Sequence, residues 1–454
     1  MIARLLFCLF CCFSGQAFAM ETGVFGRLEV RNYFLVGDIP RTGSYASRRI
    51  KEELSFQLDV QSGNDRYYMV MNPEVSVLSR QSSYDYGGGS NWLETGVYSS
   101  KDHEVRLGQF YANALFKDVR CRLGYQIIDW GHSEVDKLVS YFNPRDNREL
   151  FYNNPEKSLL PAPLFAAMYF SDHFTLEVVK ALVTSRSKTV ESYPYLPEVG
   201  NFPLPVVLRG DAGNHSQEGG YGLRLTTTLW DTDFALSGYK GADPRATYVP
   251  QSTFVDSDDR LKVIVVPEVY ELTMVGFEAE RALGPFMSAV ELAYSPNKKV
   301  LADQDLERPG QLDFPYQAVS SRWLAYNFGL NYVLPPMAWF PDSEVVFGIE
   351  HGGGKYMADG LLNILPDDYF AMAFMVSASE SLDISLRGVF EGSERDRMLW
   401  LQVYYQVLER AKLSFAYLDV DGQKPFINEI GSLFYYKKNQ DMVQLILTLD
   451  FFGD

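Results

Sequence analysis

The sequence predicts an all-β protein, a transmembrane antiparallel up-and-down β-barrel of about 18 strands. Three observations lead to this fold class. Apolar and polar residues alternate over stretches of about ten residues, short turns alternate with long connections, and aromatic residues make up 15% of the chain. Outer-membrane barrels combine alternating strands with short turns on one side and long loops on the other.

The first residues indicate export. Basic Arg4 precedes an apolar run over 5–13, and Ala17-Phe18-Ala19 supplies small residues for cleavage. We therefore expect residues 1–19 to be a signal peptide and residues 20–454 to form the barrel. An exported barrel of this type is expected in the cell outer membrane, with lipid, lipopolysaccharide and the barrel-assembly machinery as partners.

Cysteine and charge narrow the function classes. Cys121 alone follows the predicted signal peptide, so no internal disulfide and no cysteine metal site is expected. The net charge of −17 argues against nucleic acid as a partner. No G-x-S-x-G or H-E-x-x-H motif occurs, so we expect neither an enzyme, nor a cofactor, nor a metal.

The alternation is regular enough to place individual strands. In 382–393, for example, Leu382, Ile384 and Leu386 alternate with Asp383 and Ser385. We favour 18 strands, with 16 as the alternative. The expected strands cover 22–35, 50–62, 66–80, 103–115, 119–130, 163–170, 173–183, 219–230, 233–242, 263–280, 286–297, 321–334, 343–351, 368–379, 382–393, 396–408, 411–420 and 438–452.

The stretch from Cys121 to Pro163 differs from the others. Its first part is a strand with Leu123, Tyr125 and Ile127 on one face, which is expected to meet lipid. Its second part has apolar residues at helical spacing, namely Val135, Leu138, Val139 and Phe142. With Ser133 and Asp136 as a capping pair and Pro144 as a stop, this spacing predicts a short helix in the 131–162 loop.

The same stretch resembles a known family. The run from Arg122 to Gly131 is similar to the R-x-G-x-Q-x-x-x-W-G strand of bacterial outer-membrane porin-like β-barrels of poorly known function. Asn143-Pro144-Arg145-Asp146 resembles the N-P-x-D loop that follows this strand in the family. A more distant similarity is to alginate-export porins. The resemblance implies a barrel, and genes of the family often accompany RND-type exporters.

The candidate site residues come from this stretch. The polar face of the strand and the loop after it are expected to line the pore or its constriction. These residues are Arg122, Gln126, Trp130, Arg145, Asp146, Arg148 and Glu149. In the alternative interpretation, loop 131–162 caps the barrel from outside, and the strand residues only support the scaffold. Glu271 or Glu278, Glu291, Arg387 and Glu391 are further inward-facing candidates.

The function that the sequence favours is an outer-membrane channel, a porin-like conduit for a small or polymeric solute. Loop 131–162 is expected to act as its constriction. One alternative is a barrel associated with an RND-type inner-membrane exporter or a periplasmic carrier, or with envelope lipid or hydrophobic-compound traffic. A further alternative is a structural or adhesive barrel with a closed lumen. The sequence leaves the solute, the direction of transport and the oligomeric state open.

Overall fold

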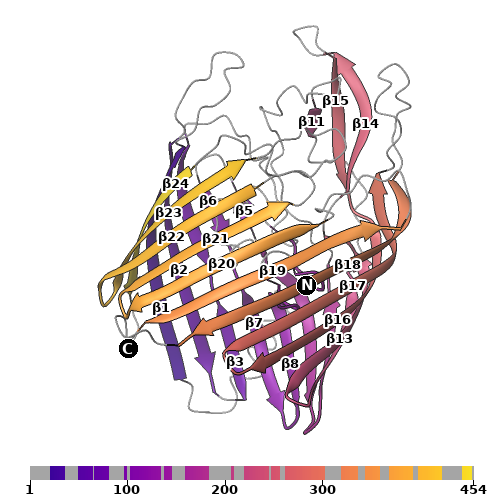
Figure 1. Cartoon of the computed structure of the whole chain (residues 1–454), viewed down its shortest axis with the longest axis horizontal. Coiled ribbons are helices and arrows are strands. Elements are labelled where there is room, and N and C mark those ends of the chain that lie inside the picture. Colours follow the sequence, from indigo (N-terminus) through magenta and orange to yellow (C-terminus); the bar gives the residue numbers. More distant parts are fainter. Residues whose placement is uncertain are drawn as a thin grey trace, which may run out of the picture.

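The chain forms a closed antiparallel β-barrel (Figure 1). The computed structural model describes residues 21–35, 50–64, 66–80, 97–99, 103–133, 137–145, 159–183, 206–208, 219–244, 247–255, 261–301, 318–335, 343–357, 368–391, 397–421 and 442–451. The predicted signal peptide lies outside these residues. Within them, no helix is long and apolar enough to cross a membrane.

Eighteen strands surround the lumen in the described part of the chain. Two of these strands are interrupted. β3 and β4 together form one barrel strand, and β6 and β7 together form the next. The strands are β1 (Glu21–Leu35), β2 (Ile50–Gly63), β3 (Tyr67–Met71), β4 (Glu74–Arg80), β6 (His103–Arg106), β7 (Phe110–Phe116), β8 (Val119–Gln126), β9 (Ala162–Phe170), β10 (Thr175–Ala181), β12 (Tyr221–Leu229), β13 (Thr232–Ala242), β16 (Glu271–Leu283), β17 (Phe286–Leu301), β18 (Ala318–Leu334), β19 (Glu344–Tyr356), β20 (Tyr369–Ser379), β21 (Leu382–Glu391), β22 (Arg397–Leu408), β23 (Ala411–Asp421) and β24 (Met442–Phe451).

The barrel closes between its first and last strands. β1 pairs with β24 in a register that runs from Gly26↔Phe451 to Leu35↔Met442. Arg27 Nε also lies 2.9 Å from Asp450 Oδ1, an ion pair across this closing seam. Closure removes the unpaired edges that an open sheet would leave. The predicted count of 18 strands is confirmed, and the alternative of 16 is wrong.

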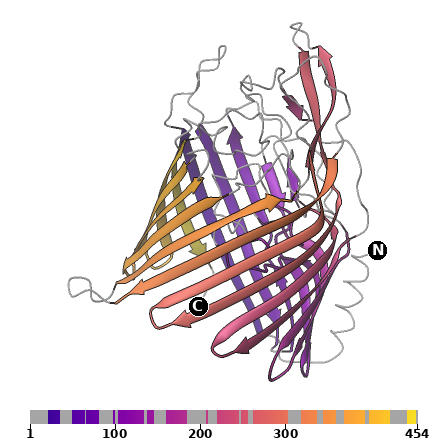
Figure 2. The same ribbon diagram turned by 45° about the vertical axis from the view of Figure 1, so that its right-hand side comes forward.

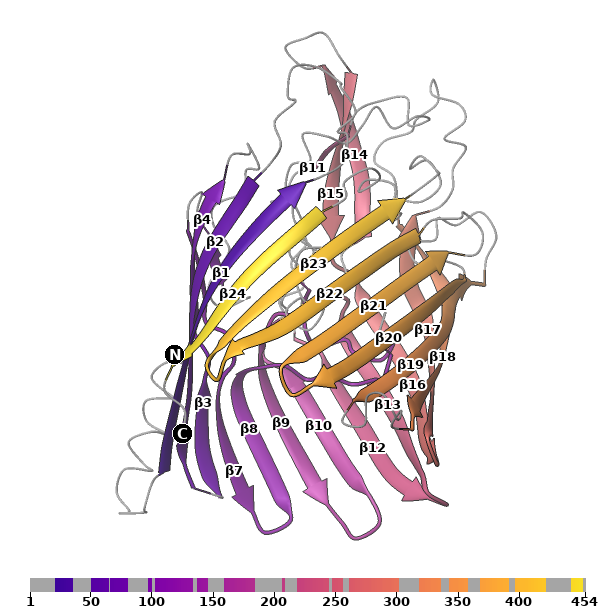
Figure 3. The same ribbon diagram turned by 60° about the vertical axis from the view of Figure 1, so that its left-hand side comes forward.

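Four further strands lie outside this count. β5 (Val97–Ser99) pairs with the upper part of the wall at β6. β11 (Val206–Leu208), β14 (Thr247–Val255) and β15 (Leu261–Glu268) form a separate three-stranded sheet. This small sheet projects beyond the rim of the barrel, at the end opposite the short hairpin turns (Figures 1 and 3).

The prediction of one strand over 263–280 is wrong. β15 and β16 are separate strands with Val269 and Tyr270 between them. The reason is a change of partner. β16 pairs with β13 only as far as Ala242↔Glu271, whereas β15 pairs with β14 in the projecting sheet. Pro267, close to the end of β15, is a sequence signal for a break at this point. The partner of each half is not encoded locally.

Side chains are distributed in the opposite way to a soluble protein. Along β16, outward Val275 is 50% exposed, whereas inward Glu278 on the same strand is 1% exposed. β18 repeats this pattern, with Phe328 exposed and Asn327 buried. Apolar residues therefore cover the outer surface, and the polar atoms lie on the inner face. A surface of this kind is suited to lipid, which tolerates no unpaired charge at its centre.

The two ends of the barrel differ in their connections. Pairs such as β7–β8, β9–β10 and β12–β13 are joined by tight turns at one end (Figures 2 and 3). In contrast, β8 and β9, or β23 and β24, are separated by much longer stretches of sequence. Trp230 and Asp231, between β12 and β13, both have positive φ angles of 53° and 57°. Two such residues in sequence match the twist of paired strands in a two-residue hairpin.

A charge on the outer face is expected to destabilise the barrel, and the same charge on the inner face is not. Phe328→Lys places an ammonium group on the outer surface of β18, which is expected to lower the free energy of unfolding by about 2–4 kcal/mol. Gln402→Lys, on the inner face of β22, is the matched control and is expected to cost much less. Denaturant unfolding in lipid vesicles measures both. Equal losses for the two variants would contradict the assignment of the two faces.

Candidate functional site

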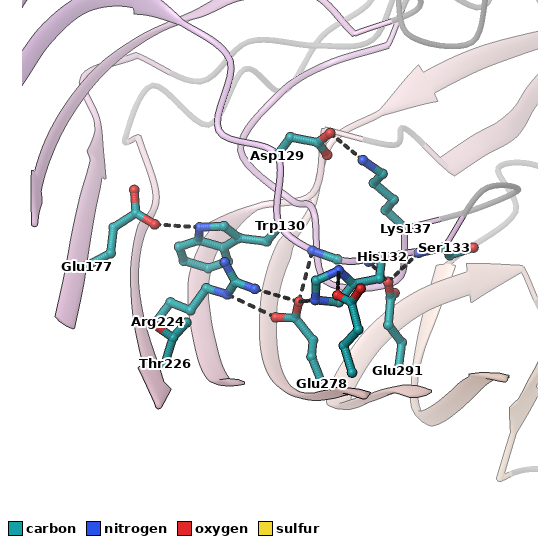
Figure 4. Close-up of polar contacts among 12 residues, drawn as sticks. Asp129, Trp130, His132, Ser133, Lys137, Glu177, Arg224, Thr226, Glu278 and Glu291 are labelled. Carbon is teal, nitrogen blue, oxygen red and sulfur yellow. Dashed lines mark hydrogen bonds and ion pairs between the residues drawn. The ribbon is translucent and has the colours of Figure 1, made fainter. Parts of the chain in front are cut away.

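The candidate site is the part of the 131–162 loop, with the residues just before it, that contacts the inner face of the barrel. We call residues 127–133 and 137–145 the loop segment. It follows β8, and its apolar side chains are buried, among them Trp130, Leu138 and Phe142. Its polar contacts reach β10, β16 and β17 (Figure 4). A further contact reaches β19.

Glu291 of β17 holds the turn of the segment. Its carboxylate accepts hydrogen bonds from the backbone N–H groups of His132, Ser133 (2.7 Å) and Leu138 (2.9 Å). Gly131 lies directly against this carboxylate with φ of 98°, and a Cβ atom there would come within 2.7 Å of Glu291 Oε1. Glycine is therefore required for both the backbone angle and the approach.

Glu278 of β16 makes a second anchor. It accepts a hydrogen bond from the backbone N–H of Gly131 (3.1 Å) and two from Arg224 of β12, at 3.0 and 2.7 Å. His132 lies beside it and contacts Glu280 Oε2 through Nδ1 at 2.9 Å. Because Glu278 is almost fully buried, its charge needs these partners, and the bidentate arginine pair is a strong one.

The hydroxyl of Ser133 connects the segment to β18, β19 and β20. It donates to Glu350 Oε1 at 2.8 Å and accepts a hydrogen bond from Asn327 Nδ2 at 2.6 Å. Tyr369 also donates to Glu350, at 2.9 Å. All of these groups are buried, so the network is satisfied from both the wall and the segment.

Trp130 anchors the other side of the segment. Its indole Nε1 donates to Glu177 Oε2 of β10 at 2.9 Å, and its ring packs edge-on against Phe142 at a centroid distance of 5.1 Å. Phe142 in turn packs edge-on against Tyr239 of β13. Glu177 also lies 3.4 Å from Arg122 Nη2. The tryptophan therefore has both an aromatic neighbour and a hydrogen-bond acceptor, as a buried indole needs.

Small residues on the wall allow this close approach. A Cβ atom at Gly222 of β12 would come within 2.6 Å of the Phe142 ring. At Gly276 of β16, a Cβ atom would overlap Cγ1 of Val139. Both glycines therefore leave room for apolar side chains of the segment.

Asn143 closes the base of the segment. Its Oδ1 accepts a hydrogen bond from the backbone N–H of Ile128 (2.7 Å), and its Nδ2 donates to the carbonyls of Gln126 and Leu160, at 3.0 and 2.9 Å. One buried amide therefore ties together the end of β8, the segment and the chain leading to β9. The Asn-Pro pair of the sequence motif has a structural role here.

The helix predicted in the 131–162 loop is absent from the described part of that loop. For residues 137–145 the prediction is therefore wrong. These residues form turns and bends instead. A helix would need the N–H of Leu138 for its own backbone, but Glu291 accepts that hydrogen bond. The hydroxyl of Ser133, the expected cap, contacts Glu350 and Asn327 on the wall. Val135 and Asp136 lie outside the described residues.

The expected strand over 119–130 also ends early, at Gln126. The N–H of Ile127 donates to the side chain of Gln109, and that of Ile128 to Asn143. Side chains thus replace a neighbouring strand as partners, and the chain turns away from the wall. Tyr125, expected to meet lipid, is buried.

The structure places the predicted pore residues as follows. Arg122 and Trp130 meet at Glu177 on the inner face. Gln126 is 0% exposed and donates through Nε2 to the Leu164 carbonyl of β9. Arg145 forms a backbone bridge with Leu159. Asp146, Arg148 and Glu149 lie outside the described residues. The pore-lining role of all seven residues stays a prediction.

The further inward-facing candidates differ in their burial. Glu278 and Glu291 are buried against the segment, whereas Glu271 lies exposed at the start of β16. Arg387 is half-buried on β21, and the side chain of Glu391 is outside the described part. Asn143 and Glu350 were not predicted. Asn143 was visible only as part of the resemblance motif, and no local pattern distinguishes Glu350.

The polar groups of the segment do not form a metal site. In the described residues, no group of three or more His, Cys, Asp or Glu side chains is arranged to hold a metal ion. The carboxylates that meet at the segment contact backbone amides and an arginine instead. The arrangement holds a loop in place.

Comparisons with known proteins support the fold. No family model and no curated protein matches the chain. Among solved structures, OccAB1 of Acinetobacter baumannii matches with a TM-score of 0.51 and 10% identity, covering 95% of this chain and 96% of that one. OccK9 (OpdG) of Pseudomonas aeruginosa matches with a TM-score of 0.50 and 11% identity, covering 95% and 98%.

Both neighbours are outer-membrane porin β-barrels and not enzymes. At this identity the likeness concerns the fold alone. The chain therefore has the fold of a bacterial outer-membrane β-barrel. The closed sheet, its apolar outer face and these neighbours agree with the predicted location in the outer membrane.

Removal of the Glu291 carboxylate is expected to release the segment. Glu291→Leu leaves three N–H groups without their acceptor, those of Ser133 and Leu138 in buried positions. Each buried N–H without a partner costs about 1–3 kcal/mol. In the folded barrel, trypsin is then expected to cut after Lys137 at least tenfold faster than in the wild type. Glu380→Leu, in the exposed turn after β20, is the matched control. Unchanged cleavage in Glu291→Leu would contradict the anchoring role.

A methyl group at Gly276 is expected to displace the same segment. Gly276→Ala introduces the overlap with Val139 and is expected to increase cleavage after Lys137. Val139→Ala removes the overlapping atom, so the double variant is expected to be cut more slowly than Gly276→Ala alone. A double-mutant cycle of cleavage rates measures this coupling. Additive effects would show that the two residues do not meet.

Proposed function

We propose that the protein is an outer-membrane channel whose lumen is narrowed by loop 131–162. The observation that supports this most strongly is the attachment of the loop segment to buried carboxylates on the inner wall, namely Glu177, Glu278, Glu291 and Glu350. A loop that only capped the barrel would need no charged partners on the inner face of the strands.

The size of the barrel supports a conduit. Barrels of about eight strands are filled by their own side chains, whereas barrels of 16–18 strands leave an aqueous channel. Eighteen strands therefore enclose more space than the wall residues fill. The segment occupies part of that space, beside the strands from β10 to β19. We propose that the solute passes on the other side, along β20–β24 and β1–β4.

The charges of the segment indicate weak ion selectivity. The wall carboxylates that face it are already bound by its amides and by Arg224. The following part of the loop contributes Arg145, Asp146, Arg148 and Glu149, which carry charges of both signs. With both signs at one constriction, neither cations nor anions are strongly excluded. We propose a general conduit for small polar solutes.

Loosening the segment is expected to raise conductance. In planar bilayers, the refolded wild type is expected to show discrete channels. Replacement of residues 130–142 by a short glycine-serine linker, with Asn143 retained, is expected to increase their conductance at least twofold. Channels of the Glu291→Leu variant are expected to fluctuate between conductance levels, unlike those of the wild type. Channels of Glu380→Leu are expected to have the wild-type conductance.

Other outcomes would favour different functions. A wild type that does not conduct but co-purifies with an inner-membrane pump or a periplasmic carrier would support the exporter-linked alternative. A barrel that conducts neither with nor without residues 130–142 would have a closed lumen, and the channel would be excluded.

A further inference from the structure

A second polar cluster lies on the inner face of β7 and β8, on the short-turn side of the loop segment. Asn113 of β7 is paired in register with Arg122 of β8, and Leu115 with Arg120. Asn113 is 4% exposed, yet its Oδ1 and Nδ2 atoms make no hydrogen bond. The Nε atoms of Arg120 and Arg122 are also buried without a partner.

Donors outnumber acceptors in this cluster. The Asn113 amide offers two N–H groups and one carbonyl oxygen, and each arginine Nε adds another N–H. Even if Asn113 Oδ1 turned toward one Nε, the remaining donors would lack an acceptor. A buried donor without a partner costs about 1–3 kcal/mol, so the cluster is incomplete as it stands.

The charges of the cluster are also unbalanced. Glu177 is the carboxylate that contacts Arg122, at the long distance of 3.4 Å, and it also accepts the hydrogen bond of Trp130. Arg120 lies over the ring of Phe170 at 5.4 Å, which attracts the guanidinium without neutralising it.

Arg224, on the same inner wall, is an arginine whose charge is fully paired with a carboxylate. It makes two hydrogen bonds to Glu278, both at 3.0 Å or less. Among the residues that the structure describes, Arg120 and Arg122 together contact one carboxylate, that of Glu177, for two positive charges. The cluster therefore has an excess of one positive charge and an excess of N–H donors.

We propose that Asn113, Arg120 and Arg122 form a subsite for the carboxylate group of a small solute. An ionised carboxylate has acceptors only, and its planar pair of oxygens matches a guanidinium and an amide. Binding turns the two arginine side chains toward the lumen, where that of Arg122 is already 19% exposed. The inference rests on the proposed channel only for the route by which the solute arrives.

A ligand titration of the folded protein in detergent tests the subsite. The probe is trifluoroacetate, followed by ¹⁹F NMR, with trifluoroacetamide as its neutral counterpart. The wild type is expected to bind trifluoroacetate and not trifluoroacetamide. Asn113→Leu and Arg122→Gln are each expected to weaken binding about tenfold, the loss of about 1.4 kcal/mol. Arg281→Gln, at an exposed position of β16, is the matched control and is expected to bind like the wild type.

Two results would overturn the subsite. One is a wild type that does not bind trifluoroacetate, or binds trifluoroacetamide equally well. The other is undiminished binding in variants that still show the gel shift of a folded barrel when unheated. Because the titration requires no membrane, its outcome is separate from conductance. Binding without conductance would overturn the channel alone, and conductance without binding would overturn the subsite alone.

Discussion

The structure depends on the requirement that backbone polar groups in a membrane be satisfied within the protein. The wall meets it by closing β1 on β24, so that every strand has two neighbours. The loop segment has the same requirement but no neighbouring strand. Four of its N–H groups are satisfied by carboxylates from the wall, one by Glu278 and three by Glu291. Inward-facing glutamates thus do for the segment what strand pairing does for the wall.

This arrangement explains why the inner wall keeps buried negative charge in an already acidic chain. A buried carboxylate is costly unless it has several partners. Glu278 has the arginine of β12 as well as the segment, and Glu350 has Asn327, Tyr369 and Ser133. The wall residues offset part of the cost, and the segment supplies the remaining hydrogen bonds. Wall and segment stabilise each other, and neither is complete alone.

Much of the barrel could be predicted from the sequence because its two faces are chemically different. Alternation of the kind seen in β16 gives each strand its orientation, and positions such as Glu278 and Glu291 follow directly as inward-facing. Between β15 and β16, Pro267 marks a break, but the sequence does not show that the two halves take different partners. Pairing is decided by distant strands, and a single sequence does not show them.

For the loop segment, the sequence predicts which side chains are buried but not the conformation of the backbone. The spacing of Leu138, Val139 and Phe142 predicts one apolar face of a helix, and these side chains are indeed buried together. They are buried, however, by a turn whose amides bind Glu291. Helical spacing reports which residues face a common surface. It does not report where the backbone hydrogen bonds go, which here depends on a residue more than 150 positions away.

Two contacts of the segment connect distant strands of the barrel wall. Trp130 contacts β10 and Ser133 contacts β19, only three residues later in the chain. Along the wall, β10 and β19 are separated by six successive strand pairings, from β10–β12 to β18–β19. At about 4.8 Å per pairing, that arc measures roughly 29 Å. Three residues of chain span about 10 Å. The segment is thus a short tie across a longer arc, and it fixes the curvature of this side of the barrel.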